Sequence, residues 1–166
     1  MSPETVTLLR TTVNGRELEL EIESREMLID LLRDRLELTG TKRSCDSQVC
    51  GACTVLLDGQ PVSSCCTLAY EANGRAVQTI EDLSRDGRLD PIQAAFVEKA
   101  AIQCGFCTPG FVLTTKAMLA ENPRPTRDEI KNYLGGNLCR CTGYWNILDA
   151  AEEAARRLAD GAEAGS

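Results

Sequence analysis

The sequence contains no histidine and very few aromatic residues. Histidine is the commonest general base, so its absence excludes every nucleophile pair of the Ser-His or Cys-His kind. Aromatic residues make up only 4% of the 166 residues, which leaves little bulk to fill a core. Something besides hydrophobic packing must therefore help to hold the fold together. A bound metal would do so, because it couples ligand binding to folding.

Long apolar runs and basic patches are missing as well. No apolar stretch is long enough to span a bilayer, and residues 1–5 contain no basic region followed by an apolar one, so no secretory signal is expected. The net charge is −7, and no basic patch is interleaved with aromatic residues, which argues against a nucleic-acid partner. We therefore predict a cytoplasmic protein, and in that compartment cysteines are more often metal ligands than disulfides.

What the sequence does contain is nine cysteines, and eight of them form two sets of four. The spacing is C-x4-C-x2-C-x11-C in the first set and C-x2-C-x31-C-x-C in the second. Four thiolates are what one [2Fe–2S] cluster requires, so the sequence predicts two such clusters and the transfer of single electrons. We predict no catalytic residue in this chain. The predicted ligands are Cys45, Cys50, Cys53 and Cys65 for the first cluster and Cys104, Cys107, Cys139 and Cys141 for the second.

The ninth cysteine and the choice of metal leave alternatives open. Cys66 is predicted to be a small buried residue beside a ligand. C-x2-C pairs also bind zinc, although zinc sites usually combine them with a second C-x2-C or with histidines. A zinc-stabilised interaction module therefore stays open as an alternative. So does a stand-alone two-cluster ferredoxin or redox sensor.

The distribution of strand and helix signals predicts an α+β fold in two domains. Strand patterns and turn pairs such as Asn14-Gly15 dominate the first half, with one amphipathic helix at residues 26–36. Helix signals dominate the second half, including an N-cap at Thr108 followed by proline and a capping box opening at Thr126. We predict strands at 6–13, 17–23, 54–57, 62–64 and 76–80, a sheet domain at 1–82, a four-helix bundle at 83–160 and a disordered tail at 161–166.

Three cysteine-containing segments carry a family resemblance. They read CDSQVCGACTV at residues 45–55, QCGFCTPG at 103–110 and GNLCRCTGY at 136–144. In these segments the chain resembles the small iron–sulfur subunit of the xanthine oxidase family, the molybdenum hydroxylases. That family includes aerobic carbon monoxide dehydrogenase, 4-hydroxybenzoyl-CoA reductase and N-heterocycle dehydrogenases. The resemblance runs from about residue 6 to residue 158 and covers all eight predicted ligands in order and spacing.

The resemblance implies a plant-type ferredoxin-like β-grasp domain for the first cluster and a helical domain for the second. It implies a large partner subunit with a molybdopterin-type molybdenum cofactor, a medium FAD subunit and a dimer of heterotrimers. Electrons would pass from molybdenum to the helical cluster, then to the first cluster, and then to FAD or another acceptor. Gln103 and Cys141 would contact the molybdenum cofactor, although Gln103 could instead be a loop cap. Ser44 stands where the family commonly has glycine, which would strain the loop if that position needs a positive φ.

Overall fold

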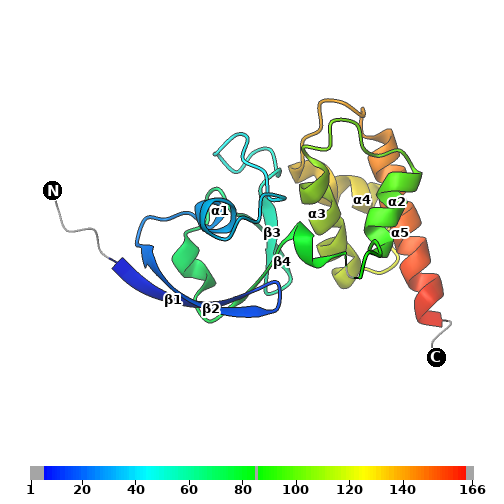
Figure 1. Cartoon of the computed structure of the whole chain (residues 1–166). Coiled ribbons are helices and arrows are strands. Elements are labelled where there is room, and N and C mark those ends of the chain that lie inside the picture. Colours follow the sequence, from blue (N-terminus) through cyan, green and yellow to red (C-terminus); the bar gives the residue numbers. More distant parts are fainter. Residues whose placement is uncertain (1–5, 85, 164–166) are drawn as a thin grey trace.

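The structure, a computed structural model, describes residues 6–84 and 86–163. A mixed sheet with short helices forms the N-terminal half, and longer helices form the C-terminal half (Figure 1). The coarse α+β prediction is therefore confirmed. The two halves lie side by side. Residues 1–5, where no secretory signal was expected, lie outside the described residues.

The sheet has the strand order β2-β1-β5-β3-β4. Strands β1 and β5 are parallel, and every other neighbouring pair is antiparallel. The β1–β2 hairpin turns at Asn14 and Gly15, both of which have a positive φ, as the predicted Asn-Gly turn requires. The strands are β1 (Val6–Val13), β2 (Arg16–Glu23), β3 (Thr54–Leu57), β4 (Gln60–Ser63) and β5 (Ala76–Gln78).

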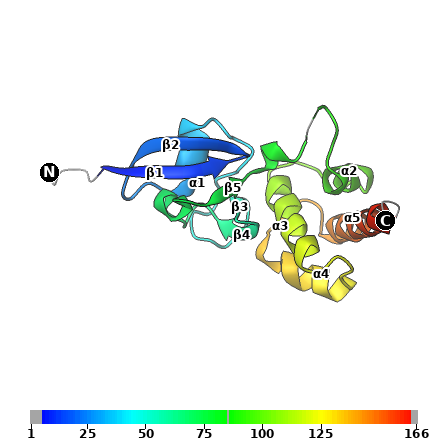
Figure 2. The same ribbon diagram turned by 90° about the horizontal axis from the view of Figure 1, so that it is seen from below.

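The helix of the sheet half packs against the sheet and is shorter than predicted (Figure 2). It starts at α1 (Leu28–Asp30), continues directly as the π-helix η1 (Leu31–Arg35), and reaches neither residue 26 nor residue 36. The wider last turn is closed by the Leu36 amide, which donates to the Leu31 carbonyl. Leu28, Leu31 and Leu32 all remain buried against the strands, so the amphipathic face is as predicted.

The second half contains four α-helices among the described residues. Asp90 caps the first with its carboxylate, and Thr126 and Glu129 form the predicted capping box of the third. The predicted cap at Thr108 is wrong by one residue, because Thr108 is already helical and Cys107 occupies the cap position. The helices are α2 (Pro91–Glu98), α3 (Thr108–Glu121), α4 (Arg127–Tyr133) and α5 (Trp145–Glu163). Short 3-10 turns lie at η2 (Ala69–Ala72), η3 (Ile80–Asp82) and η4 (Leu134–Gly136).

Helix α5 extends further than the sequence indicated. It continues to Glu163, so residues 161–163 are helical and do not belong to a disordered tail. The rest of that predicted tail, residues 164–166, lies outside the described residues. Within the described part of the chain, no helix is both long enough and apolar enough to cross a membrane.

Strand β3 joins the two halves because it is buried on both faces. Side chains alternate along a strand, so neighbouring residues of β3 face opposite sides. Val55 and Leu57 belong to the core beneath α1, whereas Leu56 belongs to the core of the helical half. Burying a leucine contributes roughly 1.5–3 kcal/mol. Leu56 therefore stabilises the packing of the first half against α3. This helix is the one nearest the sheet in Figures 1 and 2.

Candidate metal centres

The first cysteine set lies in the loop before β3 and at the end of the β3–β4 hairpin. Asp46, Gln48 and Gly51 in this loop all have a positive φ, which winds the backbone tightly between the cysteines. The hairpin returns the chain so that the Ser64 amide and hydroxyl both donate to the Cys53 carbonyl. Cys65 is thereby held beside Cys53. Both are buried, with 2% and 7% of their surface exposed.

Two pairs of neighbouring thiols make up this set. Hydrogen bonds from the Ser47 side chain and amide, and then from Cys50, lower the pKa of the Cys45 thiol to about 6. Burial raises the pKa of the Cys53 thiol to about 12, while a backbone hydrogen bond from Cys65 lowers it and the neighbouring Cys65 thiol raises it. The set therefore contains one more accessible pair, the exposed Cys45 with the half-buried Cys50, and one buried pair, Cys53 with Cys65.

Two expectations about this loop need correction. Cys66 was expected to be buried, but it is exposed, because the turn after β4 directs Cys65 inward and Cys66 outward. Its sulfur still lies 3.7 Å from that of Cys65. Ser44, in contrast, does not have a positive φ, so a serine fits there without the strain that the missing glycine suggested.

The second set is built from two segments that are distant in sequence. Cys104 and Cys107 precede α3, and Cys139 and Cys141 lie between η4 and α5. Here too the thiols are paired. Cys104 is hydrogen-bonded to Cys141, which raises the pKa of Cys141. Burial raises the pKa of the Cys107 thiol to about 12, and its hydrogen-bonded neighbour Cys139 contributes.

Cys139 has an unusually polar environment for a half-buried sulfur. Its Sγ accepts from the Cys141 amide at 3.4 Å, from the Thr142 amide at 3.5 Å and from the Thr142 hydroxyl at 3.2 Å. Burial alone would raise the pKa of Cys139, but the bonds from Thr142 and Cys141 outweigh it and lower the pKa. Negative charge on this sulfur is therefore stabilised by three donors.

The two cysteine loops touch each other directly. The Leu138 amide donates to the Cys50 carbonyl at 2.9 Å, and the buried Asn137 side chain donates to the Gly51 carbonyl at 3.1 Å. A Cβ atom at Gly110 of α3 would lie 2.2 Å from the Gly51 oxygen, so only glycine allows this approach. Sequence reasoning missed Asn137 and Gly110, because neither lies in a ligand position of the motifs.

One hollow of about 480 Å³ lies between the sets and is lined by residues of both. The first loop contributes Ser44, Cys50 and Ala52, and the second set contributes all four of its cysteines. Phe106, Leu138, Arg140 and Tyr144 complete the lining. The hollow therefore brings the second set together with Cys50 of the first.

Residues of these sets suit a two-iron group better than a single ion. Within residues 6–84 and 86–163, no group of three or more His, Cys, Asp or Glu side chains is arranged to hold one metal ion. A [2Fe–2S] cluster divides its four thiolates between two irons. The two thiol pairs of each set match that division, and none of the nine cysteines forms a disulfide.

The predicted cofactor contacts Gln103 and Cys141 are both exposed. Gln103 directly precedes Cys104, whose thiol is hydrogen-bonded to that of Cys141. The two residues therefore lie at the same edge of the second set. Phe106 and Leu138, which line the same hollow as the set, expose apolar side chains beside it.

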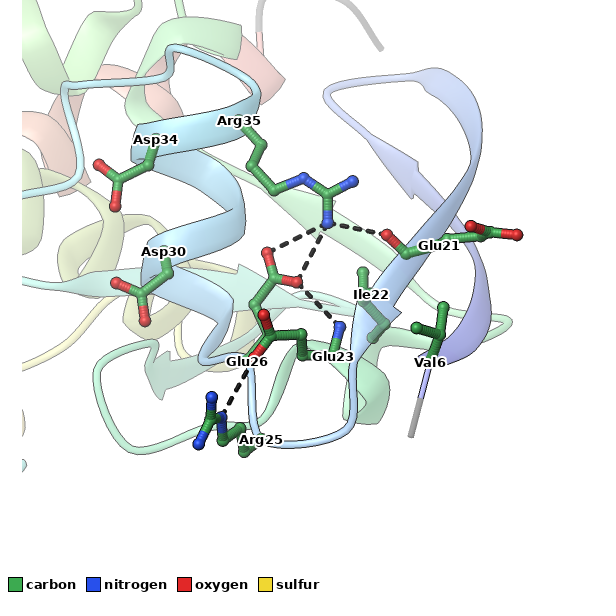
Figure 3. A pocket seen from close by; sticks show the side chains of 9 residues that line it. All are labelled: Val6, Glu21, Ile22, Glu23, Arg25, Glu26, Asp30, Asp34 and Arg35. Carbon is green, nitrogen blue, oxygen red and sulfur yellow. Dashed lines mark hydrogen bonds and ion pairs between the residues drawn. The ribbon is translucent and has the colours of Figure 1, made fainter. Parts of the chain in front are cut away.

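Another hollow lies away from the cysteines, between β2 and the α1–η1 helix (Figure 3). It has a volume of about 670 Å³ and contains no cysteine. Arg35 reaches across it to the Glu26 carboxylate at 3.1 Å and to the Glu21 carbonyl at 2.9 Å. Arg35 and Glu26 therefore form an ion pair across this hollow.

Family models match both halves of the chain. Residues 11–82 match the 2Fe-2S iron-sulfur cluster binding domain, and residues 79–152 match the [2Fe-2S] binding domain. The chain is 48% identical over 153 residues to the nicotine 6-hydroxylase small subunit of Paenarthrobacter nicotinovorans, covering 92% of each protein. It is 43% identical to the nicotinate dehydrogenase small FeS subunit of Eubacterium barkeri, covering 92% of this chain and 97% of that one.

Solved structures give the same result. Quinoline 2-oxidoreductase from Pseudomonas putida 86 superposes with a TM-score of 0.89 at 44% identity, covering 94% of this chain and 98% of that chain. Aldehyde oxidoreductase from Desulfovibrio gigas superposes with a TM-score of 0.89 at 39% identity. The match covers 93% of this chain but only 17% of that one, so there the fold is one segment of a much longer polypeptide.

Proposed function

The chain belongs to the small iron–sulfur subunits of the xanthine oxidase family of molybdenum hydroxylases, and on that premise we propose how it works. It relays electrons from a molybdenum centre in a partner subunit toward FAD or another acceptor. The observation that carries this function is the hollow that brings Cys50 of the first set together with all four cysteines of the second. When bound, a [2Fe–2S] cluster supplies a site that takes up and releases one electron at a time.

Two ligand sets hold the two clusters. Each set offers its thiols as two neighbouring pairs, which suits one pair at each iron. Cys53 and Cys65 anchor the first cluster in the sheet half, and Cys107 and Cys139 anchor the second against the helical core. The full sets are Cys45, Cys50, Cys53 and Cys65, and Cys104, Cys107, Cys139 and Cys141.

Electrons enter at the second set and leave at the first. The exposed edge formed by Gln103 and Cys141 faces the large molybdenum subunit and contacts its molybdopterin-type cofactor. The apolar side chains around that edge support this assignment, because aromatic and aliphatic anchors are typical of interface cores. The more accessible Cys45–Cys50 pair of the first set faces the medium FAD subunit.

The finer architecture belongs to the same proposal. Residues 1–82 form a β-grasp domain like that of plant-type ferredoxins, and residues 83–160 form a four-helix bundle of α2 to α5. The complex is a cytoplasmic dimer of heterotrimers. The aldehyde oxidoreductase match supports a tight association with the catalytic part, because there the same fold is a segment of a longer chain.

Metal analysis and low-temperature EPR of the purified complex test this function. About four irons per chain and two distinct S = 1/2 signals after dithionite reduction are expected from two [2Fe–2S] centres. Copurifying molybdenum and flavin support the relay. Iron without molybdenum or flavin would favour a stand-alone ferredoxin. Zinc without an EPR signal would contradict both the relay and the ferredoxin and would favour a structural zinc module.

A further inference from the structure

A short turn after the last predicted ligand, residues 142–144, is built around the sulfur of Cys139. The Thr142 hydroxyl oxygen accepts a hydrogen bond from the Tyr144 amide at 3.2 Å. Its own proton is therefore available for the Cys139 sulfur, 3.2 Å away. A hydroxyl that accepts from one side and donates to the other has a fixed orientation.

Tyr144 holds this turn in place from the opposite side. Its hydroxyl accepts from the Cys139 amide at 3.1 Å, so the turn closes on the cysteine twice. Its ring packs edge-on against the buried ring of Phe111, with centroids 6.4 Å apart. Gly143 and Tyr144 both have a positive φ, which is uncommon for tyrosine. The packing and the hydrogen bonds together hold a backbone conformation that the tyrosine would not adopt alone.

We propose that Thr142 sets the reduction potential of the helical-domain cluster and that Tyr144 is the positioning residue that aims it. Reduction adds negative charge to the cluster and its sulfurs, and a donor on a ligand sulfur stabilises that charge. The hydroxyl therefore raises the potential of this cluster relative to one without it. The inference rests on the proposed function, since it takes Cys139 as a ligand.

The experiment is a redox titration of the whole complex, with both EPR signals followed separately. Thr142→Val keeps the shape of the side chain but removes the donor, and we expect the midpoint potential of one signal to fall. The other signal and the iron content should stay as in the wild type. Thr142→Ser keeps a hydroxyl and should restore the wild-type midpoint.

Two further variants sharpen the result. Tyr144→Phe keeps the ring on Phe111 but removes the acceptor for the Cys139 amide, and it should lower the same midpoint by less than Thr142→Val. Thr108→Val is the matched control. It also follows a ligand of this set, but in the described part of the chain its hydroxyl bonds to no sulfur, so both midpoints should stay unchanged.

Contrary outcomes separate this inference from the proposed function. Two normal signals with an unshifted midpoint in Thr142→Val would overturn the tuning role while leaving the relay intact. If Thr142→Val loses the EPR signal of this cluster altogether, the Tyr144→Phe variant provides the test instead. An unchanged midpoint potential in Tyr144→Phe would then overturn the inference. A wild-type complex without iron or EPR signals would instead refute the proposed function itself.

Discussion

The two cysteine sets solve the same chemical problem in different ways. The first lies within a single stretch of 21 residues, and two of its members, Cys53 and Cys65, are buried against the sheet half. The second draws on two segments separated by 31 residues, and Cys104 and Cys141 remain exposed. The first set is therefore formed by one loop and one hairpin, whereas the second exists only when α3 and the chain before α5 have packed together.

This difference indicates which interactions stabilise the cysteine-containing region of each half. In the sheet half Cys53 and Cys65 pack with Ile29 of α1 in a small buried group, so a cluster is added to an existing support. In the helical half the segments before α3 and α5 come from distant parts of the chain, and a cluster would link them across 31 intervening residues. Metal binding should therefore contribute more to folding in the second half than in the first.

The largest effect is expected from losing a ligand of the first set. Cys65→Ser should abolish or severely alter one EPR signal, because Cys65 is the buried partner of Cys53. Cys66→Ser should leave both signals intact, since that side chain is exposed. The two cysteines are adjacent and have sulfurs 3.7 Å apart, so each variant controls for the other. The reverse pattern would show that Cys66 is the fourth ligand.

Iron removal tests the comparison of the two halves directly. After chelation, amide hydrogen exchange should accelerate strongly at residues 103–108 and 137–144 and much less in the β1–β2 hairpin. The physical reason is that the first region depends on ligands far apart in sequence, whereas the hairpin has its own register of backbone bonds. Equal acceleration in both regions would mean that the halves rely on their metals to the same extent.

Gly110→Ala tests the close contact between α3 and the Gly51 carbonyl, where the two halves meet. Alanine favours helix, so propensity alone would stabilise α3 by up to about 1 kcal/mol. Its methyl group would lie 2.2 Å from the Gly51 oxygen, however. We therefore expect a net loss of about 3 kcal/mol in the free energy of unfolding, at the upper end of overpacking costs. Urea unfolding measures it.

Gly135→Ala is the control for that prediction, because a Cβ atom there meets nothing within 4 Å. Its effect should stay within about 0.5 kcal/mol, as for ordinary surface substitutions. If Gly110→Ala were as stable as this control, the close approach of α3 to Gly51 would not exist in solution.

Asn137→Ala gives a smaller effect at the same contact. It removes the amide that donates to the Gly51 carbonyl and leaves a buried acceptor with one partner fewer. We expect a loss of about 1–2 kcal/mol in the free energy of unfolding. The exposed Asn132→Ala on α4 is the comparison, and it should change little. Equal stabilities of the two variants would contradict a structural role for the Asn137 side chain.

Much of the local structure could be predicted because its causes are local. The Asn14-Gly15 turn and the Thr126 capping box depend on residues next to one another, and both are confirmed. The cysteine spacing likewise predicted two groups, and the structure brings each group together. The ligand assignments and the domain boundaries remain predictions.

Features that depend on distant packing could not be predicted. The N-cap of α3 is Cys107 and not the predicted Thr108, and the segment predicted as one helix at 26–36 is a short α-turn followed by a π-helix. Asn137 and Gly110 matter only because a carbonyl from the other half lies against them. Thr142 showed no signal beyond its place after a cysteine, since its role depends on the direction of one hydroxyl.

The close contact at Gly51 also limits how this protein could be recombined. A chimera that joins its sheet half to the helical half of a relative would need glycine at 110 and asparagine at 137 as a matched pair, because both meet the same carbonyl. The residue at position 56 would have to match the helical half of the chimera, because Leu56 packs in the core of that half although it belongs to strand β3. A chimera joined simply at the segment before α2 would therefore not keep this contact, because the residues that must match one another lie on both sides of that segment.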